Sequence, residues 1–173
     1  FDPQVTASRP FNFYSLGIFT MRKSTWIILN SAIASTAGFA NAGERIGDFA
    51  LIDHTGAFQS MAWYDDNAAV ALLPQAVGAT HAASLEIMQN LQADYAEQGI
   101  EFFLLNPGLQ SDRTAVAAET AGVDMPVLMD DAQLVSEMLG LTRLDEAVLY
   151  NPSTFELLYR GPAGGMKEAI EQT

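Results

Sequence analysis

Residues 124–162, DMPVLMDDAQLVSEMLGLTRLDEAVLYNPSTFELLYRGP, contain the pattern that decides the fold. Near their end, two hydrophobic segments at 146–150 and 155–160 are separated by Asn151, Pro152, Ser153 and Thr154. Asparagine, proline and serine each favour a turn, for a different steric or hydrogen-bonding reason. The sequence therefore predicts a β-hairpin at this place.

The first half of the same stretch predicts a short extended segment at 126–129, followed by a helix. Asp130 or Asp131 is expected to cap that helix, because a carboxylate accepts hydrogen bonds from the free N–H groups of a first turn. Two adjacent acids can also bind a cation, but capping is their usual role at a helix start. The apolar stripe of the helix is Leu134, Val135, Met138 and Leu139, and Gly140 is expected to end it.

Further upstream, the unbroken apolar run at 68–73 (AAVALL) is typical of a strand buried on both faces, and 100–105 (IEFFLL) predicts a second buried strand. The segment between them, 82–98, predicts a helix that ends at Gly99. Its apolar stripe is Leu85, Met88, Leu91 and Tyr95. A strand, a helix and a strand with short connections predict a parallel pair.

The remaining segments complete an α/β order. Residues 47–53 and 58–61 predict an N-terminal hairpin around a turn at 54–57. Ser111 is expected to cap a helix at 112–121 that ends at Gly122. A last helix is expected to begin at 166. The predicted order is β-β-β-α-β-α-α-β-β, followed by that last helix.

Four segments in this order resemble the redoxin, or peroxiredoxin-like, branch of the thioredoxin-like superfamily. They are GERIGDFALIDHTG (43–56), YAEQGIEFFLLN (95–106), PVLMDDAQLVSEMLGLTR (126–143) and YRGP (159–162). The resemblance implies a thioredoxin-like three-layer α/β fold. Such a fold has a mixed central sheet, helices on both faces and an N-terminal β-hairpin.

The resemblance also implies cysteine chemistry, yet the chain contains no cysteine. In the family the reactive cysteine lies at the N-terminus of the long helix, where the helix dipole favours the thiolate. That position corresponds to Ala79, with Thr80 beside it, or to His81 under a second alignment. Thr80 is interpreted as a helix cap and His81 as a solvated residue. The sequence therefore predicts no catalytic residue, no cofactor and no metal site.

A second departure lies at 142–146, where many thioredoxin-like proteins have a cis proline. Leu144 or Asp145 occupies that position here. Arg143 and Arg160 are interpreted as partners of surface ion pairs, because there is no thiolate beside which they would bind peroxide.

The N-terminal region predicts export. Residues 21–42 combine the basic Arg22 and Lys23, a short apolar segment and the small residues Ala40-Asn41-Ala42, which is typical of a cleaved signal peptide. The expected location is therefore periplasmic or secreted. Residues 1–20 are interpreted as an upstream segment, and 43–173 as one domain truncated within its C-terminal helix.

Residues 43–173 contain five basic and twenty acidic side chains, a net charge of −15. A surface of this charge repels nucleic-acid phosphates and anionic lipids, so neither nucleic acid nor membrane is an expected partner of the mature domain. With no cysteine and two histidines, His54 and His81, the usual zinc sites cannot be assembled.

The leading hypothesis is a non-catalytic binding or structural module. It would serve an unknown protein partner or a covalently linked downstream domain. A first alternative is the family's antioxidant thiol oxidoreductase activity, using a partner's thiol or a metal. A second is a metal-assisted hydrolase built on His81 and nearby carboxylates.

Overall fold

The computed structural model describes residues 43–78, 82–108 and 112–173, which belong to one compact unit. The predicted upstream segment at 1–20 and signal peptide at 21–42 lie outside the described residues. The elements are β1 (Ala50–Ile52), β2 (Phe58–Ser60), β3 (Ala69–Pro74), α1 (Ala82–Tyr95), β4 (Ile100–Asn106), α2 (Arg113–Glu119), β5 (Val127–Met129), α3 (Leu134–Met138), β6 (Glu146–Tyr150), β7 (Leu157–Pro162) and α4 (Met166–Ile170).

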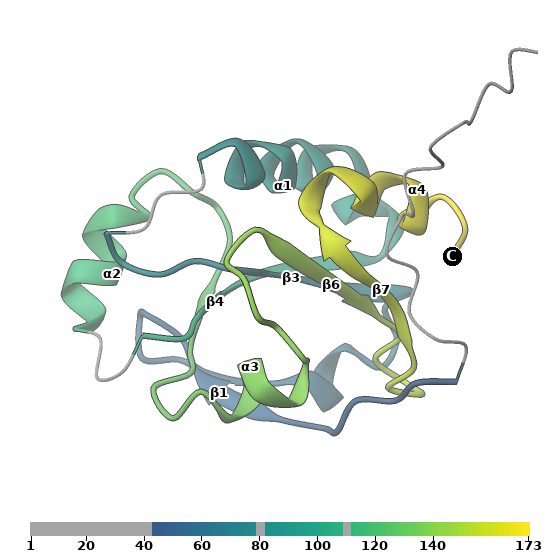
Figure 1. Cartoon of the computed structure of the whole chain (residues 1–173), viewed down its shortest axis with the longest axis horizontal. Coiled ribbons are helices and arrows are strands. Elements are labelled where there is room, and N and C mark those ends of the chain that lie inside the picture. Colours follow the sequence, from purple (N-terminus) through teal and green to yellow (C-terminus); the bar gives the residue numbers. More distant parts are fainter. Residues whose placement is uncertain (1–42, 79–81, 109–111) are drawn as a thin grey trace, which may run out of the picture. The chain divides into compact units, whose positions relative to one another are not determined.

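The central sheet has five strands in the order β5-β4-β3-β6-β7 (Figure 1). β3 and β4 are parallel, with Leu72 beside Phe103, which confirms the predicted strand-helix-strand unit. β6 runs antiparallel to β3 and pairs with β7 as the predicted hairpin. The sheet is therefore mixed, as the resemblance implied.

The segment predicted only as extended at 126–129 is a third parallel strand. β5 pairs with β4 through Leu104 opposite Val127 and Asn106 opposite Met129. The sequence hid this strand because it is three residues long, too short for a periodic pattern.

Side chains of β3 alternate between the two faces of the sheet and divide the core in two. Ala69, Ala71 and Leu73 lie in the cluster that also contains residues of α1, α2 and α4. Val70 and Leu72 lie in the opposite cluster, with residues of α3 and of the N-terminal segment. Figure 1 shows α1 and α4 on one side of the sheet and α3 with β1 on the other. The predicted three-layer arrangement is confirmed.

The long helix has almost its predicted extent. α1 continues into a 3₁₀ turn, Ala96–Gln98, and ends at Gly99. Gly99 adopts the left-handed conformation (φ 85°), and its N–H donates to the carbonyl of Ala96. Glycine adopts this conformation without the steric penalty of a side chain, which is why it ends helices so often.

The N-terminal hairpin pairs Leu51 with Gln59 and Ile52 with Phe58. Asp53 organises its turn, because its Oδ1 accepts hydrogen bonds from Thr55 N, Thr55 Oγ1 and Ala57 N. Asp53 also forms an antiparallel bridge with Leu128. The hairpin thereby covers part of the outer edge of β5.

Three expectations at the ends of elements need correction. β7 begins at Leu157 rather than at 155, because Phe155 adopts a left-handed conformation (φ 57°) that cannot continue a strand. α3 is a helix of only five residues, and Leu134, expected in its buried stripe, is 66% exposed. Asp112 caps α2 by accepting from Thr114 N at 2.8 Å, whereas Ser111, the predicted cap, lies outside the described residues.

Candidate functional site

The residues at the family's cysteine position, Ala79, Thr80 and His81, lie outside the described residues. The elements on either side are in place. β3 ends at Pro74, and α1 begins at Ala82. The order of a buried strand, a short connection and the long helix is therefore the expected one.

The first part of that connection is held by contacts with neighbouring elements. Gln75 N–H donates to the carbonyl of Leu105 at 2.8 Å. The Gln75 side chain is buried, and its Oε1 has no hydrogen-bond partner. Gly78 adopts a left-handed conformation (φ 78°), and its N–H donates to both carboxylate oxygens of Glu119, each at 3.0 Å. Glu119 thus connects this loop to α2.

A cleft of about 420 Å³ opens at the carboxyl ends of β3 and β4. Its walls come from the ends of those strands, from α3 and from the loop between α3 and β6. The lining residues are Pro74, Pro107, Gln133, Ser136, Glu137, Leu141, Thr142, Arg143 and Leu144. The carboxyl edge of parallel strands is where open α/β sheets bind ligands, so this cleft is the candidate site.

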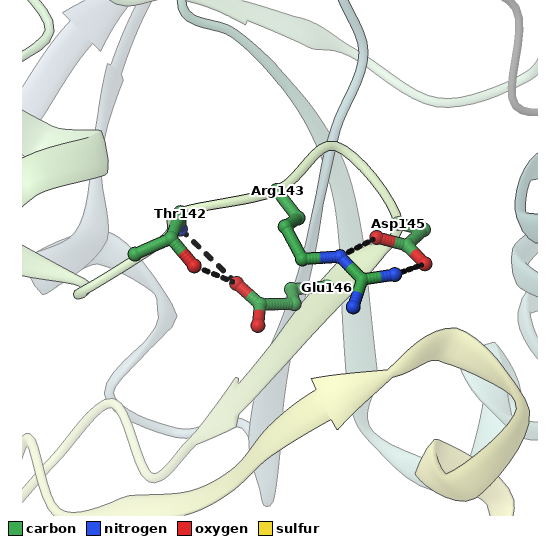
Figure 2. A network of polar contacts seen from close by, with 4 residues as sticks. All are labelled: Thr142, Arg143, Asp145 and Glu146. Atoms are coloured by element: carbon green, nitrogen blue, oxygen red, sulfur yellow. Dashed lines mark hydrogen bonds and ion pairs between the residues drawn. The ribbon is translucent and has the colours of Figure 1, made fainter.

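Two side-chain contacts shape the loop at 142–146, as Figure 2 shows. Thr142 donates from N and Oγ1 to Glu146 Oε2, at 3.0 and 3.1 Å. Arg143 donates from Nε to Asp145 Oδ1 at 2.9 Å and from Nη2 to Oδ2. These bonds hold the loop where many thioredoxin-like proteins have a cis proline, and the described residues contain no cis peptide bond.

The opposite wall of the cleft is anchored by Asp130, whose carboxylate is buried. Its oxygens accept from Val135 N at 3.2 Å, from Ser136 N at 2.7 Å and from Ser136 Oγ at 2.7 Å. The N-cap residue of α3 is Gln133 rather than either predicted aspartate, but the Asp130 carboxylate satisfies N–H groups of the first turn from upstream, while Asp131 is exposed. Gln133 adds a bond from Nε2 to the carbonyl of Pro107 at 2.6 Å.

Shifted pKa values occur away from this cleft. Burial raises the pKa of the Glu101 carboxyl and of the Tyr64, Tyr150 and Tyr159 hydroxyls. Burial also acts to raise the pKa of Asp53, but hydrogen bonds from Thr55, Gln59 and Ala57 outweigh it and lower that pKa. Each shift is accounted for by packing or by a turn, so none of them indicates an acid–base catalyst.

The two arginines singled out in the sequence both form ion pairs; the Arg143 pair lies at the surface, as predicted, whereas the Arg160 pair is partly buried. Arg143 pairs with Asp145, and Arg160 pairs with Glu44 at 2.7 Å. Among the described residues, no group of three or more histidine, aspartate and glutamate side chains lies close enough to hold a metal ion. Within the same ranges, no helix has the length and apolar character that crossing a bilayer requires.

Solved structures similar to this chain share one architecture. A hypothetical protein from Sinorhizobium meliloti matches with a TM-score of 0.62 and 25% identity over 70% of each chain. A peroxidoxin from Mycobacterium tuberculosis matches with a TM-score of 0.59 and 17% identity, over 75% of this chain and 94% of that one. An exposed lipoprotein thioredoxin from Streptococcus pneumoniae matches with a TM-score of 0.60 and 17% identity, over 73% of this chain and 100% of that one.

The domain has a thioredoxin-like fold. Identities of this size establish the fold rather than an activity. No protein-family model matches the sequence, and no curated protein is similar to it. The described residues of the domain form the mixed sheet, the long helix and a cleft at the carboxyl ends of β3 and β4, and its sequence contains no cysteine.

Sequence reasoning found part of the cleft. The stretch at 142–146 was singled out by its missing proline, and the end of the first buried strand by its place before the family's cysteine position. Pro107, Gln133, Ser136, Glu137 and Leu141 were missed as site residues. They have no shared pattern in the sequence, because three separate segments bring them together.

Proposed function

We propose that this thioredoxin-like domain is a non-catalytic binding module of an exported protein. Its cleft binds an extended segment of a partner protein. The observation that carries the proposal is a cleft among the described residues of a chain with no thiol. The cleft offers a surface for recognition, and the reacting atom of the family's chemistry is missing.

The missing sulfur bears directly on catalysis. Thiol peroxidases and disulfide reductases need a thiolate that attacks a peroxide oxygen or a disulfide sulfur. The sulfur then passes through a sulfenic acid or a mixed disulfide. Methionine, present seven times, oxidises without forming either intermediate. Residues of other types at 79 and 81 therefore cannot run the family's cycle.

The lining of the cleft favours an extended polypeptide. Pro74, Pro107 and Leu144 supply apolar contact area, while Gln133 and Thr142 are polar. The volume of about 420 Å³ lies within the range of roughly 300–1,000 Å³ that accommodates compact ligand groups. The charge of Arg143 is offset by Asp145, so shape and apolar contact, rather than attraction to an anion, would select the occupant.

Two measurements on the full chain test this proposal. The metal-free protein is expected to consume no hydrogen peroxide and to reduce no insulin disulfides with sustained turnover. A photo-crosslinking amino acid at Leu144 is expected to form discrete adducts with a partner in the producing cells. The same group at Glu97, in the 3₁₀ turn after α1, serves as the exposed control.

The outcomes separate the candidate functions. Sustained peroxide or disulfide turnover would favour the antioxidant oxidoreductase alternative and refute the non-catalytic proposal. Adducts that are no more abundant at Leu144 than at Glu97 would refute the cleft as the binding site. Discrete adducts at Leu144 without peroxide or disulfide turnover would support both the non-catalytic role and the cleft as the binding site.

We also propose that residues 21–42 are removed on export to the periplasm or the cell exterior. The order of basic, apolar and small residues supports this, as does the similarity in fold to the exposed lipoprotein thioredoxin of Streptococcus pneumoniae. N-terminal sequencing of the exported protein is expected to begin at Gly43. A mature chain that still contains Trp26 would contradict the proposal.

A further inference from the structure

The N-terminal hairpin is apolar on the side that faces away from the core. Leu51 packs against the core, and its cross-strand partner Gln59 bonds to the buried Asp53. Side chains alternate between the faces of a strand, so the pair Ile52 and Phe58 lies on the opposite, outward side. Ile52 is 49% exposed and Phe58 54% exposed. A solvent-facing side of an antiparallel pair is ordinarily polar.

Trp63 enlarges this surface. Its ring lies 5.4 Å from the ring of Phe58 in an edge-to-face arrangement, and 62% of the residue is exposed. We name Ala50, Ile52, Phe58 and Trp63 the hairpin patch. Tryptophan and phenylalanine are concentrated in the centres of protein interfaces, where they contribute large areas at low entropic cost.

A groove of about 730 Å³ adjoins the hairpin patch. Ala50, Ile52 and Phe58 line one part of it, and Met129 contributes to its apolar lining. The carboxylates of Asp112 and Asp131 lie at the same groove, with Arg113 as its single basic residue. Asp65 and Asp66, both exposed, follow Trp63 directly in the chain. The patch is thus an apolar centre with acidic surroundings.

The outer edge of β2 offers main-chain hydrogen bonds. Within the described residues β2 pairs only with β1. The Asp53 N–H donates to the carbonyl of Ala57, and the Met61 N–H donates to the carbonyl of Phe49. These two hydrogen bonds show which residues of the hairpin bond to the opposite strand. Phe58 and Ser60 occupy the alternate positions, so their N–H and C=O groups point away from β1. Such an edge accepts an additional strand.

We propose that the hairpin patch and the edge of β2 form a second binding surface, separate from the cleft. Its ligand is an extended segment of another protein in which basic and apolar residues alternate. The segment adds as a strand to β2, with its apolar side chains on Phe58 and Trp63, and its positive charge is attracted by the acidic domain as a whole. The net charge of −15 over residues 43–173 disfavours a second copy of this chain and anionic lipid as occupants.

Fluorescently labelled ten-residue peptides test this with the full chain. A peptide of alternating Lys and Val is expected to bind saturably, with affinity that falls as salt increases. Peptides of alternating Glu and Val, or of Lys and Ser, are expected to bind at least about tenfold more weakly. N-methylation of the peptide on the residues that face β2 removes its main-chain donors and is expected to weaken binding by a similar factor.

Variants locate the surface. Phe58→Ser combined with Trp63→Ser is expected to weaken binding of the Lys-Val peptide at least about tenfold, because it removes the aromatic centre. The matched control is Val77→Ser with Leu134→Ser, which removes two exposed apolar side chains elsewhere and is expected to change affinity less than about twofold. Thermal unfolding followed by circular dichroism verifies that both double variants fold.

Several results would overturn the proposal. The first is that the Lys-Val peptide shows no saturable binding up to about 1 mM. The second is that the Glu-Val or the N-methylated peptide binds as tightly as the Lys-Val peptide. The third is that both double variants lose the same amount of affinity for the Lys-Val peptide. Loss of binding in Leu144→Asp, with no loss in the Phe58 and Trp63 variant, would assign the peptide to the cleft. A wild-type dimer that dissociates in that variant, seen by sedimentation, would assign the patch to a second copy.

Discussion

Arg160 on β7 donates from Nη2 to Oε1 of Glu44 at 2.7 Å, across 116 residues of sequence. The same guanidinium donates from Nε to the carbonyl of Leu139 at the end of α3, at 2.8 Å. One side chain thereby connects the start of the described domain, the end of α3 and β7. Both partners are only partly exposed, so solvent weakens this pair less than a surface ion pair.

Arg160→Lys is expected to lower the free energy of unfolding by about 1–2 kcal/mol, because a lysine cannot supply both directed bonds of the guanidinium. Urea unfolding followed by circular dichroism measures it. Arg143→Lys is the matched control, since Arg143 pairs with Asp145 on the surface, and a loss below about 1 kcal/mol is expected there. Equal losses in both variants would contradict the connecting role of Arg160.

Gly165→Ala is expected to destabilise the domain by about 1–3 kcal/mol, because of overpacking. A Cβ at Gly165 would lie 2.5 Å from the hydroxyl oxygen of Tyr159, which donates to the carbonyl of Pro162 at 2.6 Å. A Cβ at the neighbouring Gly164 would meet nothing within 4 Å. Gly164→Ala is therefore expected to leave the melting temperature unchanged or slightly raised. A melting temperature lowered as much by Gly164→Ala would refute the steric explanation.

Asp130→Asn is expected to cost about 1.5–3 kcal/mol of stability, the range for hydrogen bonds to a buried charged group. In the variant, an NH₂ group, which donates, takes the place of one carboxylate oxygen that accepts a hydrogen bond from Ser136 or Val135. Asp131→Asn changes an exposed neighbour and is expected to change stability by no more than about 0.5 kcal/mol. Denaturant titrations of the two variants make the comparison. A loss in Asp130→Asn no larger than in Asp131→Asn would mean that the cap contributes nothing.

Asp53 is expected to make stability depend on acid. Because its folded pKa lies below the unfolded value of about 3.9, the domain gains stability from the ionised carboxylate above that value. The gain is lost as the pH falls through the folded pKa. Asp53→Asn is therefore expected to flatten the acid side of the stability curve, measured by urea unfolding between about pH 2 and 6. Thr55→Val removes one of the bonds and should give an intermediate slope, whereas an unchanged slope in both variants would contradict this account.

The elements that the sequence predicted well are those with long patterns. β3 and β4 were recognised because largely apolar runs suit strands buried on both faces. α1 was recognised because its stripe repeats over several turns before Gly99. In these segments the local pattern and the tertiary environment favour the same structure.

The errors occurred where tertiary contacts decide. Asp130 or Asp131 was expected directly before the helix, but α3 begins only at Leu134, after Gln133, and the Asp130 carboxylate reaches forward to Ser136. Trp63 is exposed, whereas its neighbour Tyr64 packs edge-to-face on Phe103 at 5.2 Å. His54 was assigned to a turn, yet its Nδ1 also accepts from Val127 N at 3.2 Å. None of these contacts has a signature within a short window of sequence.

The hydrogen bonds between Gly78 and Glu119 have a consequence for introducing a cysteine at position 79. A cysteine at position 79 would directly follow an N–H that already donates to a carboxylate on another helix. A nearby negative charge raises a thiol pKa and so opposes the thiolate that the N-terminus of α1 would favour. We expect Ala79→Cys alone to have a higher thiol pKa than Ala79→Cys combined with Glu119→Gln. A thiol introduced at position 79 would then be less reactive while Glu119 is ionised than after Glu119→Gln.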